Sequence, residues 1–230
     1  MTHPVSLTEL FEAVVLAGRH VREGFGQKTF VQKQDGTPVT KTDMAVHCEL
    51  MQWAAEHHLG FISEEGDAFS SEHTYVLYVD PLDGTNAFIH GSKEVTIVAT
   101  LMERALDSVW WKPVMSIIHE PLHNFTSVAE DNGTGWIFEG VKPSFRMHTP
   151  GITPVFTPWR VVAFAWQEAP HQMEQARMAL EFDSSMRHAP MGSTAFAGGL
   201  IASGDVNAVL YPGPSAVETV AMSLIVRSAG

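Results

Sequence analysis

The segment DPLDGTN, residues 80–86, places two carboxylates three positions apart, with a proline between them and Gly-Thr-Asn after them. It follows the run YVLYV, whose continuous apolar character predicts a strand buried on both faces. A strand that ends at Asp80 would place this carboxylate at the edge of a sheet, where open α/β folds bind ligands. Pro81 would stiffen the turn that follows, so that Asp83 and the carbonyl group of Leu82 face the same point. The segment therefore predicts an α/β fold with an oxygen-rich site at a strand end.

Two acidic motifs together indicate a cation site beside an anion site. Carboxylate and carbonyl oxygens are the ligands that Mg²⁺ prefers. Gly84 and Thr85 would begin a short helix, whose free backbone N–H groups can bind a phosphate oxygen. A second motif, Glu64-Glu65-Gly66-Asp67, directly follows a predicted strand at residues 61–63. Taken alone, the first motif also fits a capped turn and the second a solvated acidic loop, so the prediction depends on their combination.

The composition indicates one catalytic unit, which we expect to have two lobes, residues 1–142 and residues 143–230. The chain has 230 residues, of which 45% are apolar, enough for a large core. It contains no apolar run long enough to span a membrane, and its start lacks the pattern of a secretory signal, so we expect a cytoplasmic protein that does not bind membranes. The only cysteine, Cys48, cannot form an internal disulfide, and we expect it to be a small buried group on a helix.

The net charge of −12 restricts the partners of the protein. Its 14 basic residues are scattered among 26 acidic ones, whereas binding to nucleic acid or to an anionic membrane normally requires clustered Lys and Arg. We therefore expect neither as a partner. A phosphorylated ligand would need positive charge from another source, and divalent cations would supply it.

Periodicity and turn residues predict the order of the elements. In the first lobe we expect a helix at 6–22, an extended pair around Asp35-Gly36, a helix at 41–58, and strands at 61–63, 75–80, 94–103, 114–119 and 125–129. In the second lobe we expect strands at 160–166, 186–188 and 206–211, and helices at 170–182, 193–203 and 217–227. Residues 143–158, which are rich in Pro, Thr and Gly, would connect the lobes.

Four motifs follow one another along the chain: Thr40-Lys-Thr-Asp43, Glu64-Glu65, Asp80-Pro-Leu-Asp-Gly-Thr85 and Gly192-Ser-Thr-Ala195. In this order and approximate spacing, they resemble the motifs of the inositol monophosphatase family. Members of this family are Mg²⁺-dependent, lithium-sensitive phosphomonoesterases of the fructose-1,6-bisphosphatase-like superfamily. The resemblance implies a layered α/β fold, in which one lobe has an extensive antiparallel sheet with paired helices and the other a smaller mixed sheet between helices. It also implies a site between the lobes and a homodimer.

The resemblance assigns roles to residues around the metal ions. It implies that Glu64, Asp80, the Leu82 carbonyl group and Asp83 surround two or three Mg²⁺ ions, with Asp80 and Asp83 shared between two of them. Glu65 would be a supporting residue.

The resemblance also assigns roles around the phosphate of a small phosphorylated substrate. Thr85, paired with Asp43, would orient the attacking water and help to deprotonate it, and Glu64 would join them as a catalytic residue. Backbone N–H groups of Gly84 and Thr85 would hold the phosphate. Further substrate contacts would come from the fourth motif, namely from Gly192, Ser193 and Thr194.

Two departures from the family pattern leave a second hypothesis open. The family has an aspartate ligand where this sequence has Glu218, whose side chain is longer by one methylene, about 1.5 Å. The family also continues through a further strand and helix after the position of Gly230, so we expect a fold without them. The alternative is a catalytically weak member that binds metal and phosphoester. Retention of Asp43 and Thr85 favours the enzyme, because neither is needed merely to hold a cation.

The substrate is predicted from one position. Inositol-specific members place a glutamate seven residues before the aspartate ligand, and here that position is Tyr211. A tyrosine has an apolar face and one hydroxyl group, which suits an aromatic or flatter alcohol better than a polyol. The Leu-Tyr-Pro segment is similar to the bisphosphate nucleotidase branch, and histidinol phosphatase is a third possibility. We expect a small phosphomonoester other than inositol phosphate.

Overall fold

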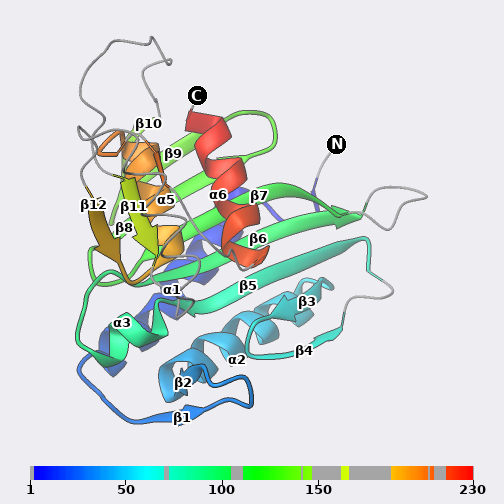
Figure 1. Ribbon diagram of the computed structural model, residues 1–230. Helices are drawn as coiled ribbons and strands as arrows, with labels where there is room; N and C mark the ends of the chain where they lie inside the picture. Colours follow the sequence, from blue (N-terminus) through cyan, green and yellow to red (C-terminus); the bar gives the residue numbers. More distant parts are fainter. Residues whose placement is uncertain are drawn as a thin grey trace.

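The computed structural model describes residues 3–69, 73–104, 111–140, 142–146, 162–165, 188–206, 208–209 and 216–229 (Figure 1). The described helices are α1 (Leu7–Gly24), α2 (Lys41–Glu56), α3 (Thr85–Ile89), α5 (Thr194–Ser203) and α6 (Ala216–Ala229). The described strands are β1 (Phe30–Gln32), β2 (Pro38–Thr40), β3 (Gly60–Ser63), β4 (Gly66–Phe69), β5 (Tyr75–Asp83), β6 (Thr96–Arg104), β7 (Trp111–Glu120), β8 (Phe125–Glu130), β9 (Gly135–Glu139), β10 (Lys142–Arg146), β11 (Val162–Ala165), β12 (His188–Met191) and β13 (Ala208–Val209).

An eight-stranded sheet in the order β10-β9-β8-β7-β6-β5-β3-β4 forms the centre of the fold. Its neighbouring strands are antiparallel, except that β3 and β5 are parallel. Strands β1 and β2 form a separate hairpin, and β12, β11 and β13 form a small sheet whose described pairs are parallel. The extensive antiparallel sheet expected from the sequence is confirmed.

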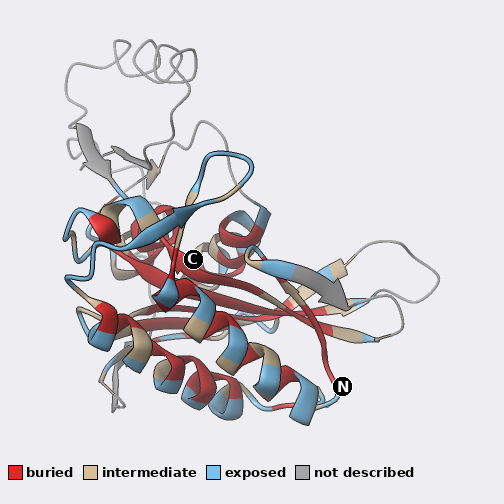
Figure 2. Ribbon diagram, turned by 90° about the horizontal axis from the view of Figure 1, so that it is seen from below, coloured by how far each residue is buried: buried red, intermediate tan, exposed pale blue. Residues whose placement is uncertain are grey.

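Helices cover both faces of the large sheet, because its central strands are apolar on both sides. On β6, Ile97 and Ala99 pack in the core that includes residues of α1 and α2, whereas Val98 packs in the core with residues of α5 and α6. This alternation follows from the two-residue period of a strand. Figure 2 shows the strands mostly buried, while the helices combine buried and exposed residues.

Both N-terminal helices begin with a capping box. Ser6 caps α1 and exchanges hydrogen bonds with Glu9, and Thr40 caps α2 and exchanges them with Asp43. Such a pair satisfies backbone N–H groups that a helix start leaves unpaired. In α2 the box therefore fixes the Asp43 carboxylate as well as the start of the helix.

The structure differs from the sequence prediction in several elements. Strand β5 does not end at Asp80 but continues through Pro81 to Asp83, with an irregular register against β6 between the two aspartates. The expected acidic loop is a two-residue turn followed by β4, which pairs with β3. Strands β9 and β10 were not predicted, and β10 occupies the start of the expected connection between lobes.

Three further expectations concern single segments. Cys48 is exposed, so the expectation that it is buried was wrong. The short strand expected at 186–188 is β12, which begins at its last residue and runs to Met191. The helix expected at 170–182 and the side chain of Tyr211 lie outside the described residues. Within the described part of the chain, no helix combines the length and the apolar character that a membrane crossing requires.

Candidate metal centre and active site

Three carboxylates from distant parts of the chain converge at one point. Glu64 comes from the turn between β3 and β4, Asp80 from β5, and Glu218 from the first turn of α6. Each offers one oxygen atom, and these atoms all lie within 4.8 Å of one another. The structure thus brings together three of the ligands predicted from the sequence, including the glutamate at the position where the family has an aspartate.

The electrostatics of this cluster favour a cation. Burial raises the pKa of Asp80 well above its usual value, and the neighbouring charges of Glu64 and Glu218 raise it further. Burial, together with the charge of Asp83, raises the pKa of Glu218 to about 7. The Oε2 atom of Glu218 is buried and has no hydrogen-bond partner among the described residues. A buried, unpaired oxygen beside two other carboxylates fits a divalent ion that prefers hard oxygen ligands, as Mg²⁺ does.

Asp83 holds the N-terminus of α5. Its Oδ2 atom accepts hydrogen bonds from the Ser193 hydroxyl group and the Ala195 N–H group, each at 2.7 Å, and from the Thr96 hydroxyl group at 3.2 Å. Its Oδ1 atom accepts one bond, from the Thr194 N–H group at 3.2 Å. Oδ1 therefore accepts fewer hydrogen bonds than Oδ2 and keeps capacity for a cation. That Asp83 binds metal stays a prediction.

Ser193 and Thr194 are buried rather than open to solvent. We predicted them as substrate contacts together with Gly192, and this prediction stays untested. The structure gives Ser193 and Thr194 a different partner, because the Ser193 hydroxyl group and the Thr194 N–H group both donate hydrogen bonds to Asp83. Gly192 has a packing role, since a Cβ atom there would lie 2.3 Å from the Cβ atom of Ala87 in α3.

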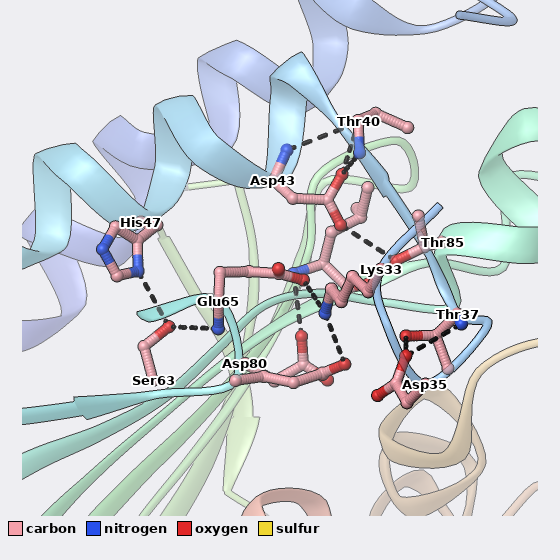
Figure 3. A network of polar contacts seen from close by, with 12 residues as sticks. Lys33, Asp35, Thr37, Thr40, Asp43, His47, Ser63, Glu65, Asp80 and Thr85 are labelled. Carbon is pink, nitrogen blue, oxygen red and sulfur yellow. Dashed lines mark hydrogen bonds and ion pairs between the residues drawn. The ribbon is translucent and has the colours of Figure 1, made fainter. Parts of the chain in front are cut away.

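Thr85 and Asp43 form a hydrogen-bonded pair beside the cluster. The Thr85 hydroxyl group lies 2.9 Å from Oδ1 of Asp43 and 2.9 Å from the carbonyl oxygen of Leu82. The other oxygen of Asp43, Oδ2, accepts hydrogen bonds from the Thr40 N–H group at 2.9 Å and from the Thr40 hydroxyl group (Figure 3). Burial raises the pKa of Asp43, although the hydrogen bonds from Thr40 and Thr85 oppose this shift. The predicted pairing of these two residues is thus present in the geometry.

Gly84 allows the start of α3 to approach α5. Its φ angle is +93°, a left-handed conformation that favours glycine. A Cβ atom at this position would lie 3.0 Å from both the Gly192 carbonyl oxygen and the Ser193 Cβ atom. The predicted phosphate contacts of Gly84 and Thr85 therefore lie where the two helix starts meet.

Sequence reasoning missed Lys33, which lies between β1 and β2. Its Nζ atom is 2.7 Å from Oε1 of Glu65 and 3.2 Å from Oε1 of Glu64 (Figure 3). The Glu65 side chain is only 4% exposed, and burial raises its pKa, although Lys33 opposes this shift. Glu65 therefore ties the hairpin to the acidic turn, which agrees with the supporting role expected from the sequence. The sequence around Lys33, which lies next to the Asp35-Gly36 turn, does not indicate such a contact.

Comparison with known proteins agrees with this geometry. The sequence model of the inositol monophosphatase family matches residues 4–230. The chain belongs to this family. A 3'(2'),5'-bisphosphate nucleotidase CysQ from Haemophilus influenzae is 30% identical over 200 residues, which cover 83% of the chain and 69% of that relative. An inositol monophosphatase 1 from Solanum lycopersicum is 29% identical over 56% of the chain, and the chain spans only 47% of its length.

Solved structures of the inositol monophosphatase family share the fold. An IMPase from Thermotoga maritima superimposes with a TM-score of 0.81 at 18% identity, over 97% of this chain and 83% of that one. Proteins of the family are metal-dependent phosphatases, so this member is a hydrolase of phosphate esters. The carboxylate cluster is the place in the described structure where a metal ion could bind.

Proposed function

We propose that this protein is a Mg²⁺-dependent phosphomonoesterase, in which water attacks the phosphorus of a small substrate. The observation that carries the proposal is the link through Leu82 between the carboxylate cluster and the Thr85–Asp43 pair. The Leu82 N–H group donates to Oδ1 of Asp80 at 2.9 Å, and the Leu82 carbonyl oxygen accepts from the Thr85 hydroxyl group at 2.9 Å. A site that only held a cation would not need a hydroxyl group fixed by a buried carboxylate. The catalytically weak alternative would give no role to the contact between Thr85 and Asp43, although Asp43 would still serve in the capping box of α2.

The residues of the chain divide into those that hold metal and those that handle the proton. We propose that the metal ligands are Glu64, Asp80, the Leu82 carbonyl group, Asp83 and Glu218, and that together they hold two or three ions. Bound Mg²⁺ would make the attacking water more acidic and stabilise the charge on the departing oxygen. The enzyme then needs no covalent intermediate.

Thr85 would position the water by accepting a hydrogen bond from it, and the direction of the single Thr85 hydroxyl proton decides whether it can do so. This proton can point to Asp43 or to the Leu82 carbonyl oxygen, but not to both at full strength. When it points to Asp43, the lone pairs of Thr85 are free to accept a proton from the water. The Thr85 proton then passes to Asp43, whose other oxygen is fixed by Thr40. Backbone N–H groups of Gly84 and Thr85 would hold the phosphate.

For the substrate, we propose a nucleoside 3',5'-bisphosphate first and an inositol phosphate second. The first follows the name of the Haemophilus influenzae relative, and the second that of the Solanum lycopersicum relative. Tyr211, in place of a glutamate, supports the first, because a tyrosine suits a flatter alcohol than inositol. Histidinol phosphate is a further substrate to include in the test.

The test is release of inorganic phosphate with Mg²⁺ and with EDTA. The substrates are adenosine 3',5'-bisphosphate, inositol 1-phosphate, histidinol phosphate and an aryl phosphate, and the blank is Asp80→Asn. We expect turnover that requires Mg²⁺, disappears in the blank and is fastest with the nucleotide. Absence of turnover on every substrate, with Mg²⁺ still bound, would favour the weak metal-binding alternative.

A further inference from the structure

His47 is buried in α2, one turn after Asp43, and its ring is fixed on three sides. Its Nδ1 atom lies 3.0 Å from the Ser63 hydroxyl oxygen. The Phe61 ring meets it edge to face, with 5.4 Å between ring centroids. On a third side lies Gly66, where a Cβ atom would come within 2.6 Å of the imidazole Cε1 atom. The ring therefore has little freedom to turn away from Ser63.

Ser63 connects this ring to the acidic turn. It is the last residue of β3, and its hydroxyl oxygen also accepts the backbone N–H group of Glu65 at 3.3 Å. Figure 3 shows His47, Ser63 and Glu65 in one line of contacts. With either tautomer of the imidazole, the hydroxyl group can bond to the ring and still accept from Glu65.

The contacts fix Glu64 from both sides along the chain. Its own N–H group donates to the Val79 carbonyl oxygen in β5 at 3.2 Å. The next N–H group, that of Glu65, is held by Ser63. The backbone of Glu64 is thus fixed before and after its side chain, although the side chain itself is 42% exposed. Because Glu64, Asp80 and Glu218 repel one another, a loose turn would move outward.

We propose that His47 is a positioning residue for Glu64, which it holds through Ser63 so that the cluster is preformed for metal. This inference rests on the proposed function of the site. Residues four apart lie on the same face of a helix, so α2 directs Asp43 to Thr85 and His47 to the acidic turn. One rigid helix then sets the spacing between the group that takes the proton and the group that holds the metal.

The test measures Mg²⁺ binding by the rise in thermal midpoint as Mg²⁺ is added, without substrate. His47→Leu keeps most of the packing but loses the hydrogen bond, and His47→Asn places an amide near the former Nδ1 position. We expect His47→Leu to raise the Mg²⁺ concentration for half-maximal stabilisation about tenfold, as other supporting residues of metal ligands do. We expect His47→Asn to stay within about threefold of wild type, and saturating Mg²⁺ to restore turnover in both.

Ser63→Ala gives an independent test through a smaller change. It should weaken Mg²⁺ binding as much as His47→Leu does, and the double variant should be no weaker than either, because the two residues act in one chain of contacts. The matched control is His57→Leu, at the C-terminal end of the same helix, where the ring contacts the Trp53 carbonyl oxygen. It should bind Mg²⁺ like wild type.

The outcomes separate this inference from the proposed function. If Mg²⁺ stabilises wild type but not Glu64→Gln, and His47→Leu and Ser63→Ala match wild type, the inference is wrong while the metal site stands. Equal weakening in His47→Leu and His47→Asn would also overturn it, because packing alone would explain the effect. If Mg²⁺ does not stabilise wild type at all, both proposals fail together.

Discussion

Acidification should destabilise the fold through His119, a buried residue of β7. Its Nδ1 atom lies 2.8 Å from the Thr126 hydroxyl group, but its Nε2 atom has no partner among the described residues. A Cβ atom on Gly18 in α1 would lie 2.6 Å from Nε2, so the space beside this nitrogen is closed. Burial, with a smaller contribution from Arg22, lowers the pKa of His119 to about 4, from 6.5.

The sign and size of the effect follow from proton linkage. The folded state resists protonation, whereas the unfolded chain takes up a proton near pH 6.5, so stability is lost as pH falls from 6.5 towards 4. For these two pKa values, the contribution of His119 to the free energy of unfolding should fall by about 2 kcal/mol between pH 7.5 and pH 5. Two buried glutamates, Glu120 and Glu218, have pKa values raised to about 7 and act with the opposite sign.

The measurement is urea unfolding in EDTA at several pH values, with His119→Asn as the matched variant. Asparagine can retain the contact with Thr126 but cannot titrate, and the glutamates cancel in the comparison. Wild type should lose about 2 kcal/mol more than the variant between pH 7.5 and pH 5, or about 1 M in urea midpoint for an m-value of about 2 kcal/mol per M. A change in stability with pH that is the same in the two proteins would refute the argument.

Three other changes test the site. Thr85→Val should lower kcat at least about 100-fold, while Mg²⁺ should still stabilise the protein against heat. Thr85→Ser keeps the hydroxyl group and should retain most of the wild-type rate. An unchanged kcat in Thr85→Val would exclude the proposed proton pathway. Gly192→Ala should lower the free energy of unfolding by about 1–3 kcal/mol, because the new Cβ atom would clash with Ala87. Adding Ala87→Gly should relieve this clash and restore stability. Chemical denaturation of the two variants measures both effects. Mg²⁺ binding near pH 7 should release protons, because Glu218 is then partly protonated. The affinity for Mg²⁺ should therefore rise from about pH 6 to pH 8. Calorimetry in two buffers of different ionisation enthalpy measures the protons released, and a value of zero would contradict this prediction.

The sequence predicted the elements with strong periodicity and the motifs with a chemical reason. Asp80 and Glu64 were predicted in one site because each was expected to follow a buried strand. The structure brings them together because β5, which contains Asp80, pairs with β3, which Glu64 follows. The extension of β5 to Asp83 was missed because a proline usually ends a strand, yet here an irregular register accommodates it. Which side chains meet across the fold is not encoded in local pattern.

His47 and Lys33 illustrate that limit. A histidine four residues after Asp43 is only one polar residue on a helix until β3 supplies Ser63 beside it. Lys33 lies 32 residues before Glu65, and nothing near either residue indicates their contact. By contrast, the Thr40–Asp43 capping box is local in sequence, and so is the turn around Asp35. Short-range hydrogen bonds could therefore be expected from the sequence, whereas the supporting contacts of the proposed metal ligands could not.

The hold of Asp83 on α5 has a consequence for the order in which the protein becomes active. The carboxylate and the Ser193 hydroxyl group that it accepts from are 110 residues apart in the chain. On the ribosome, Asp80 and Asp83 emerge well before α5 and Glu218 exist. At that stage a nascent chain carries the two aspartates of β5, but it has neither α5, whose N-terminus Asp83 holds, nor the carboxylate of Glu218. Hydrolysis of phosphate esters would begin only after α5 and α6 dock, so synthesis would time the onset of catalysis.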